Sequence, residues 1–376
     1  MNKFVRKVAS DAVWNVCRVL PVQRNKVVFS SLGGRGFGDN PKAIALALME
    51  RDPELDLVWL TNNMNTPLPE GIRPCPYGTP QAVKELSTAA VWVNDSRGGA
   101  KYKKKGQSYL QTWHGFALKH IERSAVNLPE SYVEQCKKDS AMTDLMVSGS
   151  GFMSRVYRED FWYDGEIGEF GSPRNDVFFR ENSYPQKVKG FFGLPEDRHF
   201  FLYAPTFRDD GATDCYAIEP QTVIEACEKR FGGRWSALCR LHPNAAKLSK
   251  GMFPYDGDRI IDATAYPDMQ ELLLACDLLI TDYSSSMFDY ALSGKPCLRF
   301  ATDIEAYTKE RGFYFRLEDL PFPLSKSVAE LCRCIETFDE LEQAKRWTDF
   351  TEANGFKEDG GAADRCAQWI LSKLRK

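Results

Sequence analysis

Hydroxyl side chains gather at the point where an apolar run of this sequence ends. Leu278 to Ile280 reads as a buried strand, and Thr281, Asp282, Tyr283, Ser284 and Ser285 follow it, before a helical pattern that continues to Leu292. A helix N-terminus offers free backbone N–H groups and the positive end of the helix dipole. The segment is therefore suited to bind phosphate. The alternative is an ordinary helix cap, because Ser and Asp are also common at helix starts.

Two of the four histidines stand at the ends of predicted strands. His114 follows the strand Tyr109–Thr112 and precedes Gly115, which has no side chain to keep a ligand away. A histidine in such a position can act as a general base. His242 follows a second strand, Ala237–Leu241. For both histidines, the alternative is an imidazole that hydrogen-bonds within its own turn.

Further polar segments are weaker candidates. Arg208 also follows a strand, and its guanidinium matches the geometry of phosphate oxygens. Asp209 and Asp210 could be read as a metal site, but adjacent acids in a loop are more often solvated, and we predict no metal. The glycine-rich loop Gly33–Gly38 lacks the spacing and the downstream acid of a dinucleotide site, so we predict no cofactor. His120 is expected on the surface of a basic helix.

The elements that must position these residues alternate between strand and helix, which predicts parallel sheets with helices on both faces. A length of 376 residues favours two domains. The proline-containing segment Gly171–Gly190 interrupts the alternation and is the predicted linker. We expect two doubly wound Rossmann-like α/β domains, residues 23–178 and 179–376, with a site in a cleft between them. The strands include Val27–Ser30, Leu57–Leu60, Val91–Asn94, Leu145–Ser148, Phe200–Ala204 and Pro296–Phe300, and two closing helices span Val328–Thr351 and Ala362–Leu374.

Composition excludes several classes of protein. With 49 basic and 52 acidic residues, the net charge of −3 gives no sign of nucleic-acid binding. No apolar run reaches the length of about 18 residues that a membrane span needs. Eleven cysteines without the spacing of a zinc site predict a reducing compartment, and hence the cytosol.

Residues 1–22 are predicted to form a separate amphipathic helix. Its apolar stripe and basic flank suit a helix that lies on an anionic membrane surface. The alternative is a helix docked on the protein's own core. The stripe contains Val5, Val8, Ala9, Ala12, Val13, Val16, Cys17 and Leu20, the flank contains Lys3, Arg6, Lys7 and Arg18, and Trp14 lies near the boundary.

An ordered set of short motifs resembles the CDP-glycerol glycerophosphotransferase family of teichoic-acid and capsule synthesis. Each motif is weak alone, but together they follow the family's order from Asn25 to Phe315. They are Asn25–Phe29, Asp39–Pro41, Gln111–Gly115, Pro173–Asp176, Tyr203–Asp209, Leu241–Pro243, Ile280–Ser285 and Arg311–Phe315. The loop after His114 departs from the pattern, because Phe116 and Ala117 replace the usual Thr-Pro, so it is expected to suit a different acceptor.

The resemblance implies a GT-B architecture and an inverting transfer without a bound metal. An acceptor hydroxyl attacks the glycerol-bearing phosphorus of CDP-glycerol, and CMP leaves. By resemblance His114 is the general base and His242 contacts the diphosphate. The donor side is expected to comprise Arg208, Thr281, Asp282, Ser284, Ser285, Arg311 and Gly312, and the acceptor side Gly33, Asn40, Asn94, Trp113 and Gly115.

The acceptor and the polyol stay open at this stage. The resemblance implies an undecaprenyl-diphosphate-linked saccharide or a teichoic-acid chain as acceptor, and the short chain favours a primase over a polymerase. Both acceptors are lipid-linked, so we expect the protein to lie on the inner face of the cell membrane. The alternatives are a CDP-ribitol-dependent ribitol phosphotransferase, a GT-B enzyme that uses a nucleotide sugar, and a binding module without turnover.

Overall fold

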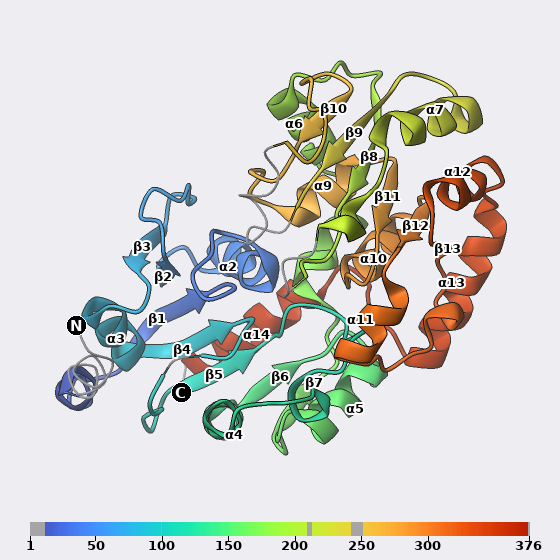
Figure 1. Ribbon diagram of the computed structural model, residues 1–376. Coiled ribbons are helices and arrows are strands. Elements are labelled where there is room, and N and C mark those ends of the chain that lie inside the picture. The colour runs from blue at the N-terminus through green and yellow to red at the C-terminus, as the bar shows by residue number, and fades with distance from the viewer. Residues whose placement is uncertain (1–11, 99, 209–212, 242–250, 375–376) are drawn as a thin grey trace. The chain divides into compact units, whose positions relative to one another are not determined.

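Two parallel sheets organise the chain in a computed structural model (Figure 1) that describes residues 12–98, 100–208, 213–241 and 251–374. Each sheet belongs to one compact unit. The first unit contains the chain up to Gly115, Glu122–Arg180 and the segment from Gly355 onward. The second unit contains Phe116–Ile121 and Glu181–Asn354. The expected fold class, two doubly wound α/β units of the GT-B type, is confirmed.

The sheet of the first unit has seven strands in the order β3-β2-β1-β4-β5-β6-β7. All neighbours run parallel. The order reverses between β1 and β4, which makes the carboxyl ends of these two strands the expected ligand edge. The strands are β1 (Gln23–Ser30), β2 (Asp56–Thr61), β3 (Ile72–Pro76), β4 (Ala89–Asn94), β5 (Ser108–Gln111), β6 (Leu145–Val147) and β7 (Glu166–Gly168).

Both faces of this sheet are covered because its strands are apolar on both sides. Val27 and Phe29 of β1 pack in one core with α2 (Asp39–Arg51) and α14 (Ala362–Leu374). Val28, between them, points to the other face, where it packs with α3 (Pro80–Thr88). The remaining helices of the unit are α4 (Glu130–Met142) and α5 (Gly151–Asp160), and the 3-10 helices are η1 (Glu122–Ser124) and η2 (Pro173–Phe179).

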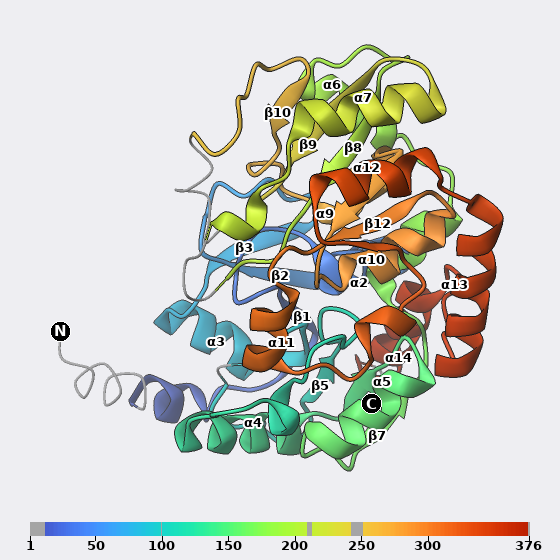
Figure 2. The ribbon, with the colours of Figure 1, turned by 45° about the vertical axis from the view of Figure 1, so that its right-hand side comes forward.

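The second unit repeats this plan with a six-stranded parallel sheet in the order β10-β9-β8-β11-β12-β13. Here the order reverses between β8 and β11. One face packs against α7 and α12, which Figure 2 shows over the sheet. The strands are β8 (His199–Tyr203), β9 (Trp235–Cys239), β10 (Ile260–Asp262), β11 (Leu278–Thr281), β12 (Cys297–Phe300) and β13 (Leu324–Ser325). The helices are α6 (Tyr184–Phe192), α7 (Pro220–Phe231), α9 (Met269–Ala275), α10 (Ser286–Tyr290), α11 (Ile304–Arg311), α12 (Val328–Glu336) and α13 (Glu340–Asn354), with η3 (Asp214–Tyr216), η5 (Ala291–Ser293) and η6 (Leu317–Asp319).

The structure differs from the sequence expectation in the way the chain is divided. The helix α14, expected in the second domain, packs its buried face on the first sheet. Phe116–Ile121, expected in the first domain, belongs to the second unit, and His120 lies outside any α-helix. The predicted linker contains η2 and most of α6. The predicted helix Val328–Thr351 is two helices, α12 and α13, interrupted after Glu336.

The predicted N-terminal helix falls partly outside the described residues, because residues 1–11 are not among them. Residues 12–17 are helical. Trp14, expected near the boundary of the apolar stripe, is buried with Cys17, and its ring meets Tyr102 edge-on at 5.2 Å between centroids. Val16 and Val19 are exposed instead. This segment therefore packs on its own unit through one side and presents valines on another.

The cysteines behave as small apolar side chains. All eleven are free thiols, nine of them buried and the other two, Cys332 and Cys334, half-buried. Burial raises the pKa of Cys239 and Cys366 far above the usual range of a thiol. No helix of the described residues is long and apolar enough to cross a bilayer.

A buried ionic cluster ties β1 to α3 and β3. The Lys26 ammonium lies 2.7 Å from Glu85 and 3.6 Å from Asp56. Arg73 binds the same two carboxylates at 2.8 and 2.6 Å. Burial alone would raise the pKa of Glu85, but hydrogen bonds from Arg73 and Lys26 lower it to about 2. Glu85 is therefore a carboxylate that the fold needs in its charged form.

We predict that Glu85→Gln lowers the free energy of unfolding by about 3 kcal/mol, because it leaves a buried ammonium without its nearest counter-ion. The exposed Glu70→Gln is the control and should be neutral. Because the folded pKa of Glu85 is depressed, its stabilisation is present above its unfolded value of 4.5 and is lost as the pH falls towards about 2. Urea unfolding at pH 7 and pH 3 measures both effects, and equal midpoints for Glu85→Gln and the parent at pH 7 would contradict the assignment.

Candidate functional site

His114 lies in the first unit, in the loop that leaves the carboxyl end of β5. Its Nδ1 atom is 2.6 Å from the carbonyl oxygen of Asp95, the residue after β4. A carbonyl can only accept, so Nδ1 carries the proton and Nε2 is the basic nitrogen. Burial lowers the pKa of His114 below the usual histidine value. The imidazole is therefore neutral near neutral pH, which is the form a general base needs.

The backbone around His114 is held in an unusual conformation. Trp113 has φ +54° and Gly115 φ +138°, in the region that L side chains seldom adopt. The Trp113 ring stacks on the imidazole at 4.3 Å between centroids and meets Phe161 edge-on at 4.8 Å. Backbone strain of this kind persists only where surrounding contacts enforce it. The loop is thus fixed from both sides of His114.

Asn40 and Arg174 supply these contacts. The Asn40 side chain is buried; its amide donates to the Trp113 carbonyl at 2.9 Å, and its oxygen accepts from the Arg174 N–H at 3.0 Å. Arg174 in turn donates to the His114 carbonyl at 2.9 Å and pairs with Asp39 at the same distance. Asn40, predicted on the acceptor side, therefore holds the His114 loop. Arg174 was missed as a site residue, although it stands in the quoted motif Pro173–Asp176.

Asp95 connects His114 to the strand-order reversal of the sheet. Its carboxylate accepts from the Ser31 hydroxyl and the Leu32 N–H, both at 2.7 Å, just beyond β1. Burial, and after it the nearby Asp39 carboxylate, raises the pKa of Asp95 to about 7. Asp95 could not be predicted as a site residue, because its role depends on two loops that meet only in the folded sheet.

The other predicted acceptor-side residues lie along the same edge. Asn94 ends β4 and its amide donates to the Tyr109 hydroxyl at 3.2 Å. Gly33 follows β1 with φ +67°, and its carbonyl accepts from Asn62 at 2.8 Å. A side chain added at Gly33 would meet open space, so its positive φ, rather than crowding, favours glycine there.

In the second unit, Asp282 connects the loops after β8 and β11. One carboxylate oxygen accepts from the Thr206 N–H at 2.9 Å, from its hydroxyl at 2.6 Å and from the Tyr283 N–H at 2.5 Å. The other lies 2.9 Å from the Arg208 guanidinium. The Thr281 hydroxyl donates to the Ala204 carbonyl at 2.7 Å. These predicted donor residues join the two strands across which the order reverses.

Arg208 is enclosed by acids and aromatic rings. Besides Asp282 it binds Asp303, with its Nε 2.7 Å from a carboxylate oxygen. Its guanidinium carbon lies 4.7 Å from the centre of Tyr307 and 5.1 Å from that of Tyr283, and these two rings stack at 4.1 Å. Two carboxylates compensate the charge of this buried side chain, so the geometry favours positioning of the Asp282 loop over direct binding of phosphate.

The predicted phosphate-binding segment is a short turn of helix. The expected helix to Leu292 is α10, which ends at Tyr290 and passes into η5. Ser284 and Ser285 are half-buried at its start. The Ser284 hydroxyl accepts from the Ser286 N–H at 3.3 Å, as a cap does. Ser285 is the N-cap residue of α10, but among the described residues its hydroxyl has no partner, so Ser285 fits the ligand interpretation, while Ser284 bonds within the turn.

Lys119 was missed by the sequence reasoning and faces the same loops. It pairs with Phe313 in an antiparallel bridge, and its ammonium lies 3.3 Å from the Tyr307 hydroxyl. Burial lowers the pKa of Lys119 to about 8, against the raising influence of Asp282. Gly312, a predicted donor residue, approaches His120 so closely that an added Cβ would lie 2.7 Å from the ring nitrogen. Arg311 beside it is exposed.

Two candidates fall outside the described residues. His242, the second predicted catalytic histidine, lies in the segment 242–250, and Asp209 and Asp210 lie in 209–212. In the described ranges no group of three or more His, Cys, Asp or Glu side chains is arranged to hold a metal ion.

Comparisons with known proteins agree with this arrangement. The chain is 32% identical to the teichoic acid poly(glycerol phosphate) polymerase of Staphylococcus epidermidis over 341 residues and to that of Bacillus subtilis over 352 residues. These matches cover 86% and 89% of this chain but 47% and 46% of the two polymerases, so the chain spans about half their length. A polymerase of the same name from Bacillus spizizenii is 29% identical to this chain. That match covers 95% of the polymerase and 96% of this chain.

Solved structures show the same likeness. The wall teichoic acid polymerase TagF superposes with a TM-score of 0.85 at 26% identity, over 100% of this chain and 98% of that one. A TagF variant soaked with CDPG superposes with a TM-score of 0.84 at 28% identity, covering 99% and 97% of the two chains. The family described as CDP-glycerol:poly(glycerophosphate) glycerophosphotransferase matches residues 13–372. With nearly the whole chain matched, with Asp95 and the Asp282 loop at the two strand-order reversals and with His114 bonded to Asp95, this protein belongs to that glycerophosphotransferase family.

Proposed function

We propose that this chain transfers glycerol phosphate from CDP-glycerol to a hydroxyl of a teichoic-acid acceptor and releases CMP. The observation that carries the proposal is a neutral, half-buried His114 whose Nδ1–H is fixed on the Asp95 carbonyl. Family membership and the CDPG soak of a related polymerase support the choice of donor.

In the proposed reaction, Nε2 of His114 takes the proton of the acceptor hydroxyl as its oxygen attacks the glycerol-bearing phosphorus. The bond from that phosphorus to the CMP oxygen breaks, and the electron pair leaves with CMP. Phosphoryl transfer depends mainly on positioning and on charge stabilisation. Positioning of the imidazole would be provided by Trp113, Asn40 and Arg174.

The donor diphosphate would be stabilised by groups of the second unit. We assign Ser285, Arg311 and Lys119 to contact with phosphate, and His242 to the same task by family resemblance. Arg208, Thr281 and Asp282 would position this loop, because their hydrogen bonds are made within the protein. Lys119 would gain the most from a bound diphosphate, since the anion would offset the burial that lowers its pKa.

The nature of the acceptor is less constrained. Chain length does not separate primase from polymerase, since the Bacillus spizizenii polymerase has nearly the same length as this chain. We keep a saccharide-ended, undecaprenyl-diphosphate-linked acceptor as the favoured proposal. A CDP-ribitol-dependent transferase is the second candidate.

We predict that His114→Ala lowers turnover by about 10²–10⁴-fold, the usual contribution of a general base. Binding of CDP-glycerol should change only a few-fold. Because burial lowers the pKa of His114, its neutral form persists as the pH falls, so the acid limb of kcat/KM should lie below about pH 6.5. CMP release measured from pH 5 to 9 tests both statements, with His199→Asn as the control. Turnover near that of the parent in His114→Ala would sink the assignment.

We predict that Ser285→Ala weakens CDP-glycerol binding about tenfold, because a hydrogen bond to a charged group contributes about 1.5–3 kcal/mol. The melting temperature of Ser285→Ala should equal that of the parent, since the Ser285 hydroxyl has no partner among the described residues. Ser284→Ala should lower the melting temperature, because the Ser284 hydroxyl accepts from the Ser286 N–H at the start of α10. Calorimetric titration and thermal unfolding separate the two. An unchanged dissociation constant for Ser285→Ala would remove this loop from the donor site.

We further propose that the N-terminal helix brings the protein to an anionic membrane surface through Val16 and Val19. Both valines are exposed, at 70% and 84%. Trp14 and Cys17 pack on the first unit, so deleting the helix would also disturb the fold. Basic residues near an anionic surface add about 1 kcal/mol each, and salt screens this attraction.

We predict that Val16→Ser with Val19→Ser reduces flotation with anionic liposomes by about tenfold or more, given about 1.5 kcal/mol for each valine that enters the interface. The matched control is Val126→Ser, at another exposed valine of the same unit. Raised salt should release the parent protein further. If the double variant floats as well as the parent, the valines make no contact with lipid.

A further inference from the structure

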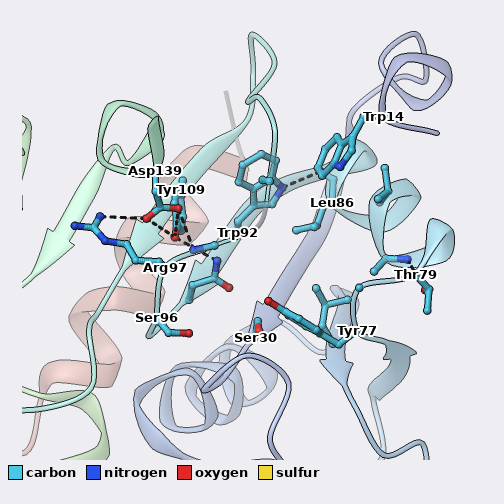
Figure 3. Close-up of a pocket in the computed structure, with 17 residues that line it drawn as sticks. Trp14, Ser30, Tyr77, Thr79, Leu86, Trp92, Ser96, Arg97, Tyr109 and Asp139 are labelled. Carbon is cyan, nitrogen blue, oxygen red and sulfur yellow. Dashed lines mark hydrogen bonds and ion pairs between the residues drawn. The ribbon is translucent and has the colours of Figure 1, made fainter. Parts of the chain in front are cut away.

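A cavity of about 180 Å³ lies in the first unit, at the carboxyl edge of the sheet (Figure 3). Ser30, Leu60 and Asn94 form its floor; the register pairs Ser30 with both of the other two. Val83 and Leu86 of α3 line another wall. The cavity thus belongs to the strand ends that also carry Asp95 and, through it, His114.

The charged residues that line the cavity satisfy each other. Arg97 lies 3.3 Å from Asp139 and 2.7 Å from Glu122 outside the lining. Asp139 also accepts from the Gly98 N–H at 3.0 Å and from the Tyr109 hydroxyl at 3.2 Å. No other lining residue is charged. The cavity therefore offers no uncompensated cation to a phosphate, and a neutral ligand suits it better.

Neutral polar groups in the lining are unpaired. The Ser30 hydroxyl, in a side chain only 5% exposed, and the Tyr77 hydroxyl have no partner among the described residues. The side-chain oxygen of Asn94 also has no partner among the described residues, since the hydrogen bond of this side chain is made by its amide nitrogen. Figure 3 shows the Ser30 and Tyr77 hydroxyls at the same end of the cavity. Neither hydroxyl is a fully buried atom, so both are open to the cavity and can bond to a ligand that carries hydroxyls of its own.

The remaining lining is aromatic and fits a ring. Trp14, Tyr77 and Trp92 surround the cavity with flat apolar surfaces. A protein cavity of about 150 Å³ takes up benzene, so a volume of about 180 Å³ accommodates one six-membered ring. A pyranose has an apolar C–H face for the aromatic rings and a hydroxyl edge for Ser30, Tyr77 and Asn94. An alkyl chain would leave those polar groups unpaired.

We propose that this cavity is a saccharide subsite that binds one neutral pyranose ring of the acceptor. The proposal rests on the proposed function and deepens it, because it selects a saccharide-ended acceptor. Asn94 and Ser96 line the cavity on either side of Asp95, whose carbonyl holds His114. A ring bound here sits beside the strand end that fixes the base. Trp14 makes the N-terminal helix part of the acceptor site.

The test measures the binding of methyl β-D-glucopyranoside and of its 2-acetamido analogue. Saturation-transfer NMR on the full chain, without donor, detects the bound glycoside. Val83→Phe places a ring in the cavity, and Val133→Phe, at a half-buried valine of α4 outside the lining, is the matched control. We expect the parent and Val133→Phe to bind a glycoside and Val83→Phe to lose it. Affinity for CDP-glycerol should be equal in all three, which also reports on folding.

Equal glycoside binding by Val83→Phe and the parent would overturn the proposal, as would binding of glycerol 3-phosphate in place of the glycosides. Should Val83→Phe not fold, Ser30→Ala with Tyr77→Phe keeps the shape and removes the hydroxyls. Its glycoside affinity should fall about two- to tenfold per hydroxyl; an unchanged affinity overturns the proposal. The experiment contains no donor, so a failure of CMP release would count against the proposed transfer and leave the sugar result standing.

Discussion

The reversal of strand order within each parallel sheet is the constraint from which both candidate sites follow. At a reversal the connections leave to opposite sides of the sheet, which opens a crevice between the loops that follow the two adjacent strands. In the first unit Asp95 bonds to Ser31 and Leu32 across β4 and β1. In the second, Asp282 bonds to Thr206 across β11 and β8. In each unit one buried aspartate therefore links the two loops at the reversal and sets the geometry of the neighbouring functional loop.

The two aspartates serve different chemistry because of what surrounds them. Asp282 faces the guanidinium of Arg208 and stays a fixed acceptor for backbone and hydroxyl groups. No cation of the described residues pairs with Asp95; burial and Asp39 raise the pKa of its carboxyl to about 7, and it acts on His114 through its backbone carbonyl. In the first unit burial keeps the imidazole of His114 neutral while the Asp95 carbonyl orients it, and in the second unit a compensated guanidinium fixes the Asp282 loop.

The sequence predicted the strands that carry functional residues at their ends, but it did not predict the contacts between the loops that follow those strands. The apolar runs predicted β11 with its observed bounds and the carboxyl ends of β1 and β4 at Ser30 and Asn94, because fully buried parallel strands read as continuous apolar runs. The polar start of β1, from Gln23 to Lys26, was missed. Short strands such as β7 and β10, and helices with mixed polarity such as α4 and α6, gave no comparable signal. The role of Lys119 was hidden for another reason: its neighbours suggested a surface helix, and only pairing with Phe313 brings it towards Tyr307. The crossing of α14 to the first sheet likewise depends on distant contacts that local periodicity does not report.

The buried cysteines also allow unfolding of this protein to be followed by labelling of its native thiols. A thiol reacts as its thiolate, and burial holds Cys239, Cys276 and Cys366 in the protonated form, away from reagent. Alkylation of these positions requires local or global opening, whereas Cys332 and Cys334 on α12 are partly accessible in the folded state. Because buried thiols occur in both units, the rates at which individual cysteines are labelled separate the opening of one unit from that of the other without any introduced probe.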